Sequence, residues 1–338
     1  MHNEKIVFKI RRPIPLVGHI AFGVIDRGTN IIQVRPTSLC NLNCIFCSVD
    51  AGPYSRWRRT EYVIDDTEWL ANWVIEIAKF KGGGVEALID GVGDPFTYSR
   101  LPELIALLRS SNHITSIAVE THGQFLNKEL INKLANAGLD RINLSIDTTD
   151  QEQAKILAGT STYDVTNVMK MTEYIVKETS IDVTLVPVWL PGINDNEIMK
   201  IIEWGMKIGV GKKWPPFAIQ KYLIHKYGRK IESIKEVSWN DFYDWLHSLE
   251  KKYGVKLILH PKDFGFERKP TLPTPYEKDS IVNVEIIASG WLKNEWLGIP
   301  KSKNRIITVI SREKLEEGQK INVRIISNKD NIYIAQLL

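Results

Sequence analysis

The chain is poor in cysteine and has no long apolar run. Only three of its 338 residues are cysteines, and all of them lie between positions 40 and 47. An odd, clustered set makes a poor disulfide framework, so we expect a reducing cytoplasm and a metal site. No stretch of about 18 apolar residues occurs, which argues against a membrane partner. The N-terminal stretch also lacks the apolar core of a signal peptide.

Strong charge of either sign is missing as well. Lys and Arg number 44 against 40 Asp and Glu, which leaves a net charge of only +4. With 43% hydrophobic and 25% charged residues, the composition is that of an ordinary globular protein. The length has room for one large domain and a small one. A polyanionic partner must therefore be argued from local patches and not from the overall charge.

Residues 31–260 alternate β-rich apolar runs with helical patterns. Strands that are apolar at nearly every position, each followed by a helix, predict a parallel sheet covered on both faces. Six such units predict an α/β fold, a partial (β/α)6 TIM-like barrel whose working groups lie at the C-terminal ends of the strands. The expected strands are Ile31–Val34, Ala87–Asp90, Ile117–Glu120, Arg141–Ile146, Asp182–Val188 and Ala218–Lys221. The expected helices are Thr67–Phe80, Leu101–Arg109, Lys128–Ala137, Asp164–Glu178, Asn196–Lys207 and Trp239–Tyr253.

The pattern changes on both sides of this core. Residues 1–30 form an N-terminal extension, in which positions 18–28 are typical of a hairpin. Residues 261–275 contain four prolines and are typical of a linker. Residues 276–338 carry short alternating runs separated by turns, which predict a small all-β, antiparallel barrel of the OB type. The expected strands there are Ile281–Ile287, Arg305–Ile310, Lys320–Ile326 and Asn331–Leu337.

The three cysteines form a C-x3-C-x2-C motif in the loop after the first expected strand. Cys40, Cys44 and Cys47 can hold three irons of a cubane cluster, which leaves the fourth iron open to an exogenous molecule. Structural zinc is the alternative, but zinc needs four ligands. A fourth cysteine is absent, and no histidine lies within twenty residues of the motif. An aromatic residue, Phe46, precedes the last cysteine.

This segment resembles the signature of the radical SAM superfamily, and more narrowly its archaeal-type Fe–S oxidoreductases. The resemblance extends over about 230 residues. It implies one [4Fe–4S] cluster on the three cysteines, with S-adenosylmethionine (SAM) bound at the open iron. Reductive cleavage of SAM would then give a 5′-deoxyadenosyl radical. It also implies an electron donor such as ferredoxin or flavodoxin.

Two turns resemble the SAM-binding motifs of that superfamily. Gly91 and Gly93 let the backbone approach a ligand closely, and Asp94 ends the turn where the family more often has Glu. In the family this acid receives the amino group of SAM. Thr121 begins the next motif, in which His122 replaces the family's Asn. A plain turn is the alternative reading for both.

Two further strand ends resemble SAM contacts of the family. Ser145 and Asp147 share one face of a strand and would meet the ribose or carboxylate. Val188 and Asn194 belong to a PG-x-ND loop that would contact adenine. A satisfied hydrogen-bond network is the alternative for the first pair. Turn and cap chemistry is the alternative for the second, with Asp195 as the helix N-cap.

A basic segment suggests the substrate. Between positions 204 and 231 lie seven Lys or Arg, interleaved with aromatics, and no Asp or Glu. Phosphate binding and base stacking require that combination, although a solvated basic face would look the same. The motif after the cysteines adds Arg56, Arg58 and Arg59. The candidate substrate-binding residues are Lys212, Lys213, Lys221, Arg229, Trp291 and Lys293.

The C-terminal segment resembles a TRAM module, which occurs on RNA-modifying enzymes. The combined interpretation is a radical SAM enzyme acting on RNA, with tRNA the favoured class. All three cysteines are committed to one cluster, which leaves none for a second cluster or a methyl-carrying cysteine. Two alternatives stay open. One is a radical SAM enzyme that acts on a protein or a small metabolite, and the other is a non-catalytic Fe–S protein that binds RNA.

Overall fold

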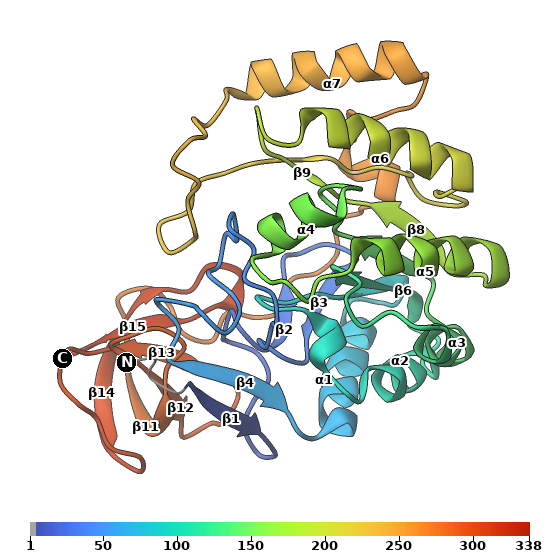
Figure 1. Ribbon diagram of the computed structural model, residues 1–338. Coiled ribbons are helices and arrows are strands. Elements are labelled where there is room, and N and C mark those ends of the chain that lie inside the picture. The colour runs from blue at the N-terminus through green and yellow to red at the C-terminus, as the bar shows by residue number, and fades with distance from the viewer. Residues whose placement is uncertain (1–4) are drawn as a thin grey trace. The chain divides into compact units, whose positions relative to one another are not determined.

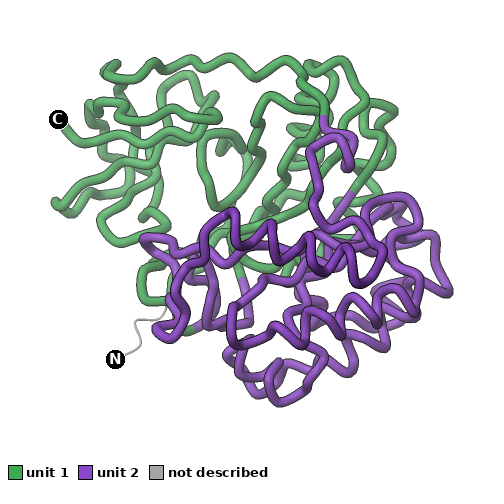
Figure 2. Tube along the Cα trace, turned by 90° about the horizontal axis from the view of Figure 1, so that it is seen from above, with its two compact units in different colours: residues 1–39, 54–117, 267–338 green, residues 40–53, 118–266 purple. Residues whose placement is uncertain are grey.

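The computed structural model describes residues 5–338. The chain forms two compact units, and each gathers segments that are far apart in the sequence (Figure 2). Unit 1 comprises residues 1–39, 54–117 and 267–338, and unit 2 comprises residues 40–53 and 118–266. The predicted domain boundaries follow the sequence continuously and stay a prediction. Residues 1–4 of the predicted N-terminal extension lie outside the described part.

Unit 1 contains the first strands and helices of the α/β core. β2 pairs antiparallel with β3, and β3 pairs parallel with β5. The hairpin expected within 18–28 therefore lies slightly later in the chain. Asp66 caps the first helix by accepting a hydrogen bond from the backbone N–H of Trp69 at 2.9 Å. The elements are β2 (Gly23–Asp26), β3 (Ile31–Arg35), β5 (Val85–Ile89), α1 (Thr67–Phe80), the 3-10 turn η1 (Pro95–Thr97) and α2 (Leu101–Arg109).

A two-stranded parallel sheet in unit 1 was not predicted. β1 (Ile6–Ile10) pairs with β4 (Thr60–Ile64), which follows the cysteine loop in the chain. Each strand is only five residues long, and neither is followed at once by a matching partner in the sequence. Short strands whose partner is distant leave no local signal, because their pairing is decided by the tertiary structure.

The C-terminal segment of unit 1 is a closed five-stranded barrel (Figure 1). This confirms the predicted small all-β barrel, while the TRAM identity stays a resemblance. Two details were wrong: a strand at Glu295–Pro300 was missed, and β13 pairs with β15 in parallel. The missed strand contains a glycine and ends in proline, which are signals of a turn. The barrel order is β11 (Ile281–Ser289), β12 (Glu295–Pro300), β13 (Ile307–Ile310), β15 (Ile334–Leu337) and β14 (Lys320–Ser327).

The proline-rich segment is fastened to unit 1 from residue 267 onward. Its backbone N–H at Leu272 donates to the Asp26 carboxylate at 2.8 Å, and its carbonyl at Pro270 accepts from Lys81 at 2.8 Å. Lys81 and Asp26 also form an ion pair at 2.6 Å whose side chains are both 0% exposed. A buried pair of this kind needs further hydrogen bonds. The segment that was expected to be a linker supplies them.

Unit 2 continues the parallel arrangement. The C-terminal half of β6 (Ile114–Thr121) pairs with β7 (Arg141–Leu144), and β7 pairs with β8 (Asp182–Leu185), all in parallel. These pairings, each followed by a helix, confirm the α/β class. Gly138 ends α3 in the left-handed conformation with φ 92°, as its position after the helix indicated. The helices are α3 (Lys128–Ala137), α4 (Gln151–Ala158), α5 (Val165–Glu178), α6 (Asp195–Ile208) and α7 (Trp239–Tyr253).

Three strand predictions in unit 2 were too long. The expected strand Arg141–Ile146 ends at Leu144 as β7. The expected strand Asp182–Val188 breaks into β8 and β9 (Val188–Trp189), and the last strand shortens to β10 (Gln220–Lys221), which pairs parallel with β9. Pro187 lies at the break and has no N–H for a ladder hydrogen bond. No helix within residues 5–338 combines the length and apolar character needed to cross a membrane.

Candidate functional site

The three cysteine side chains lie in unit 2, on the loop after β3. Cys44 is buried, and Cys40 and Cys47 are half-buried. Burial raises the pKa of the Cys44 thiol well above its usual range, and the neighbouring charges of Cys40 and Cys47 raise it further. A backbone N–H, that of Ala51, also donates to the Cys47 sulfur at 3.2 Å.

The donor set fits a cluster better than a single metal ion. Within residues 5–338, no group of three His, Cys, Asp or Glu side chains stands close enough to hold one ion. A cubane cluster accepts a wider spacing, because each thiolate binds a different iron. A tetrahedral zinc ion needs four ligands at bonding distance from one centre. The loop supplies three thiols, the number that three irons of such a cluster need.

Helix α4, which the sequence patterns did not reveal, supports the cysteine loop. The backbone N–H of Asn43 donates to the Ala158 carbonyl at 2.8 Å, and that of Ile45 donates to Leu157 at 3.0 Å. These carbonyls belong to the last turn of the helix and lack partners within it. A side chain at Gly159 would place its Cβ 2.2 Å from the Asn43 oxygen. The sequence marks the two ends of helix α4 only by Asp150, the N-cap, and Gly159, the C-cap.

Arg229 clamps the same loop from a distant part of the chain. Its guanidinium forms an ion pair with Asp50 at 2.9 Å and donates to the carbonyls of Cys44, at 3.0 Å, and Ala51. Its backbone N–H donates to the Cys47 carbonyl at 2.8 Å. Arg229 was expected to contact substrate, but the structure turns its charge onto the cysteine loop.

Three of the predicted SAM-binding residues form one hydrogen-bond network. Asp147 accepts from the Val188 backbone N–H at 2.8 Å. The Asn194 amide donates to the carbonyls of Asp147 and Val188, both at 2.9 Å, and its oxygen accepts from Leu190 at 2.7 Å. Asn194 is the N-cap residue of α6 in place of the predicted Asp195, which is the first helical residue. The network fixes the ends of β7 and β9 against each other.

A small cavity joins this network to the cysteines. Its lining includes Cys44, His122, Asp147 and Tyr163, and its volume of about 10 Å³ is enough for one water molecule. His122 Nε2 lies 4.0 Å from the Cys44 sulfur, and its backbone carbonyl accepts from the Tyr163 hydroxyl at 2.8 Å. Burial raises the pKa of Asp147, while His122 opposes that shift. The turn that contains His122, in place of the family's Asn, therefore lies beside the loop that carries Cys44.

Three other predicted SAM contacts, Ser145, Thr121 and Phe46, also belong to unit 2. The Ser145 backbone N–H donates to the Thr121 carbonyl at 2.8 Å, which holds the two strand ends together. Ser145 is half-buried, and Thr121 and Phe46 are buried. The Thr121 hydroxyl accepts from the Gly123 N–H at 3.0 Å, which shapes the turn. A ligand role for these three residues stays a prediction.

The glycine turn lies in unit 1, against the chain that leads into Cys40. A Cβ at Gly93 would stand 2.1 Å from the Leu39 oxygen, so only glycine fits there. The Asp94 N–H donates to that same oxygen at 2.8 Å, and its carboxylate caps η1 through Phe96 at 2.9 Å. Gly91 is less crowded, with its nearest atom, the Thr37 oxygen, at 3.2 Å. The turn therefore has a structural role beside the predicted binding of SAM.

The basic segment presents less charge than its sequence suggests. The ammonium of Lys212 donates to two carbonyls at the end of α5, at 2.7 and 3.1 Å. Lys221 is buried and pairs with Glu236 at 3.1 Å. Lys213 lies over the ring of Trp214, 4.5 Å from its centroid. The fold thus takes up Lys221 and Arg229, whereas the other five basic residues of the segment are exposed: Lys207, Lys212, Lys213, Lys226 and Lys230.

Glu197 is a second supporting residue that the sequence patterns missed. Its carboxylate accepts from the side chain of Thr148 and from both the backbone and side chain of Thr149, at 2.7 to 3.0 Å. It also pairs with Lys200 at 2.6 Å. These hydrogen bonds overcome the effect of burial and lower the pKa of Glu197 to about 2. Glu197 thereby holds the chain directly after Asp147.

We expect Glu197→Gln to destabilise the protein near neutral pH and much less in acid. A carboxyl whose pKa falls on folding stabilises the protein above its unfolded pKa, and that contribution fades as pH falls toward the folded value. The loss should be about 2 kcal/mol near pH 7 and should shrink below about pH 4.5. Urea denaturation of both proteins at about pH 7, 5 and 3.5 measures it. A difference independent of pH would contradict this account.

The sequence of this chain matches known radical SAM proteins. The model of the radical SAM superfamily matches residues 34–205. An uncharacterized protein of Methanocaldococcus jannaschii is 38% identical over 97% of this chain and 80% of its own length. The GTP 3′,8-cyclase of Aquifex aeolicus is 29% identical over 76% of this chain and 72% of its own length. That of Chlorobaculum tepidum is 29% identical over 52% of this chain and 50% of its own length.

Solved structures of low sequence identity share the fold. Streptococcus suis SuiB superposes with a TM-score of 0.52 at 17% identity, over 67% of this chain and 47% of SuiB. HydG, a maturase of the [FeFe]-hydrogenase, gives a TM-score of 0.52 at 13% identity, over 74% of this chain and 55% of HydG. This chain thus spans about half the length of these two structures.

The chain belongs to the radical SAM superfamily, whose partial TIM-like barrel it shares. The cofactors of this superfamily are a [4Fe–4S] cluster and SAM, and they are the cofactors of this chain. The donor set fits this assignment, since three thiols and no more are grouped on one loop.

Proposed function

We propose that this chain cleaves SAM reductively and that the resulting 5′-deoxyadenosyl radical modifies RNA, with tRNA the first class to test. The grouping of three thiols, and only three, on one clamped loop carries the radical part of the proposal. When bound, the cluster and SAM supply the one-electron cleavage chemistry. The electron would come from a donor such as ferredoxin or flavodoxin.

The chain's own residues have distinct tasks in this proposal. Cys40, Cys44 and Cys47 would hold three irons, while Arg229 and α4 fix the loop on which they lie. Asp147, held by the Val188 N–H, would accept hydrogen bonds from hydroxyl or amine groups of SAM. Phe46 and the buried strand ends would exclude water, which strengthens those interactions.

A basic pocket in unit 1 supports RNA as the substrate. Its volume is about 260 Å³, and it lies beside the turn between β11 and β12. Four cationic side chains line it against two acids, Glu295 and Glu313. The Glu295 carboxylate accepts a hydrogen bond from the Leu292 backbone N–H at 2.9 Å, and burial raises the pKa of Glu295. The cations of this pocket are Arg59, Lys293, Arg312 and Lys314.

Such a pocket suits phosphate groups beside a nucleobase. Arg and Lys neutralise phosphate and release counterions. Trp296 is half-buried in the same wall and offers a ring for stacking. Trp291, which was predicted to bind substrate, is only 8% exposed and belongs to the interior. Of the predicted substrate-binding residues, Lys293 lines this pocket, and a substrate role for Lys212 and Lys213 stays a prediction.

We expect Lys293→Ala combined with Lys314→Ala to weaken tRNA binding about tenfold and to lower its salt slope by about two counterions. Lys170→Ala combined with Lys177→Ala, on the exposed face of α5, is the matched control and should change neither quantity. Filter binding or fluorescence anisotropy at several salt concentrations measures both. Equal loss in the two double variants would mean that tRNA binds without using this pocket.

A free nucleotide is the second candidate substrate. Two curated relatives are named GTP 3′,8-cyclase, a name that refers to a nucleotide. Formation of 5′-deoxyadenosine separates the candidates when the anaerobically reconstituted, reduced protein is given SAM with tRNA, with GTP or alone. Stimulation by tRNA supports the proposal, and stimulation by GTP alone replaces it. Absence of product in all three, despite a verified cluster, overturns the radical part.

A further inference from the structure

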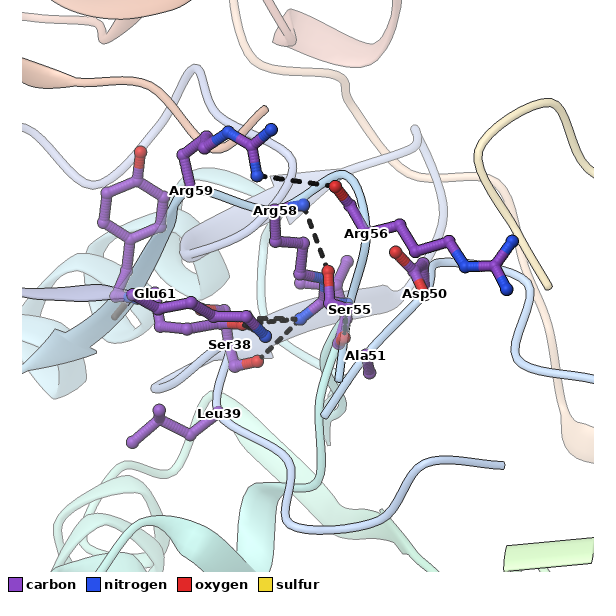
Figure 3. A network of polar contacts seen from close by, with 12 residues as sticks. Ser38, Leu39, Asp50, Ala51, Ser55, Arg56, Arg58, Arg59 and Glu61 are labelled. Atoms are coloured by element: carbon purple, nitrogen blue, oxygen red, sulfur yellow. Dashed lines mark hydrogen bonds and ion pairs between the residues drawn. The ribbon is translucent and has the colours of Figure 1, made fainter. Parts of the chain in front are cut away.

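Arg58 has the largest side chain that is fully buried in the described chain. The residue is 1% exposed, and its side chain is 0% exposed. The sequence suggested that Arg58 belongs to a phosphate-binding group with Arg56 and Arg59, but burial removes it from any such surface. A guanidinium cannot lose its charge, so the surrounding residues must compensate it. Figure 3 shows the polar contacts around it, with Ser38, Ser55 and Glu61 nearby.

The guanidinium binds both segments that lead to the proposed SAM site in unit 1. Its Nη1 donates to the Ser38 carbonyl at 3.0 Å and forms an ion pair with Glu61 at 3.3 Å. Its Nη2 donates to the Val92 carbonyl. Ser38 lies two residues before Cys40, and Val92 is the middle residue of the turn between Gly91 and Gly93. One side chain thus joins the start of the cysteine loop to the glycine turn.

The C-terminal barrel contributes an aromatic ring to the surroundings of this guanidinium. The Arg58 carbon Cζ lies 4.8 Å from the ring centroid of Trp291, which follows β11. The backbone N–H of Arg59 donates to the Trp291 carbonyl at 2.8 Å, and Arg58 forms an isolated antiparallel bridge with Leu292. A desolvated cation over an indole ring is stabilised by the ring's quadrupole. The barrel therefore provides one side of the Arg58 environment.

We infer that Arg58 is a positioning residue for SAM and that the C-terminal barrel, through Trp291, forms part of the SAM-binding structure. The inference rests on the proposed assignment of the Gly91–Asp94 turn to SAM. The planar fork of Arg58 fixes the Val92 carbonyl relative to the chain before Cys40. Without the indole face, water reaches the guanidinium and weakens both hydrogen bonds. The turn then loses its fixed position, and SAM affinity falls.

A pair of substitutions at one position tests the coupling. Trp291→Leu removes the aromatic face, whereas Trp291→Phe keeps a face. The indole N–H has no hydrogen-bond partner within residues 5–338, so phenylalanine sacrifices no hydrogen bond. Val323→Ala, in the barrel core and away from Arg58, is the control for general destabilisation of the barrel. The measurement is equilibrium dialysis of SAM against the reconstituted full chain, with iron content determined in parallel.

We expect Trp291→Leu to raise the SAM Kd about tenfold, or 1.4 kcal/mol, with unchanged iron. Trp291→Phe should stay within about twofold of the parent, and Val323→Ala should lower the Tm without changing the Kd. If Trp291→Leu does not fold, Arg58→Lys is measured in its place. Lysine keeps the positive charge but lacks the planar guanidinium with its two parallel donors, so this variant should raise the SAM Kd to a similar extent.

Two results would overturn the inference while SAM binding by the parent protein stands. One is a parental Kd in Trp291→Leu, or in Arg58→Lys where that variant replaces it. The other is an equal rise in Val323→Ala, which would mean that any weakening of the barrel has this effect. Failure of the parent chain to bind SAM would instead overturn the proposed SAM site itself, and the inference with it.

Discussion

Replacing Cys44 with alanine should abolish cluster binding, leaving less than about a tenth of the parental iron after reconstitution and no formation of 5′-deoxyadenosine. Cys44 is the buried member of the three cysteines, and the charges of Cys40 and Cys47 act on it. Each thiolate holds its own iron, so the other two cannot substitute for a missing one. Iron and sulfide analysis, together with the visible absorption of the cluster, measures the loss.

The control for this variant lies on the same loop. Ser48 is exposed and follows Cys47 directly, so Ser48→Ala changes the loop without removing a thiol. It should keep full iron and full SAM cleavage. Parental iron and SAM cleavage in Cys44→Ala would remove the cluster from these three cysteines altogether.

Arg229→Gln should make the cluster labile. The substitution removes the ion pair with buried Asp50 and the donors to the Cys44 and Ala51 carbonyls. Breaking a buried pair by removing one partner typically costs about 3–5 kcal/mol, because the other charge stays buried. We expect the loop to open more often and iron to pass to a chelator at least about tenfold faster. The rate of colour formation with a ferrous chelator measures this.

The adjacent residue supplies the matched control. Lys230 is exposed and lies 3.5 Å from Glu232, a surface pair of the kind that contributes about 0–1 kcal/mol. Lys230→Gln should therefore release iron at the parental rate. Asp50→Asn should recover part of the loss when combined with Arg229→Gln, because the uncompensated charge disappears. Equal iron release from Arg229→Gln and the parent would rule out the clamp.

Most helices could be predicted because their signals are local. The bounds of α1, α2, α3 and α7 agree with the sequence patterns, since caps and apolar periodicity lie within each segment. Helix α4 was not predicted because it has only eight residues and little apolar periodicity, although Asp150 and Gly159 mark its ends. The parallel pairing of β1 with β4 was not predicted because the two strands are distant in the chain.

The candidate site divides in the same way. The cysteine spacing is local, and so are the glycine turn and the strand-end residues Asp147 and Asn194. The contact between Arg229 and Cys44 spans 185 residues, and that between Arg58 and Val92 spans 34. In the sequence both arginines stand among other basic residues and aromatics, which indicated a surface for RNA. Nothing local distinguishes them from the exposed Lys226 or Lys230.

The sequence by itself determined the class of chemistry, because three thiols at this spacing on one loop need no distant residue to form a cluster site. It also determined the alternation of strands and helices and the presence of a small C-terminal barrel. Only the tertiary structure decided where the positive charges act. A buried guanidinium is stable only where carbonyls, a carboxylate or a ring meet it. Those partners come from remote segments, as Asp50 does for Arg229 and Trp291 for Arg58.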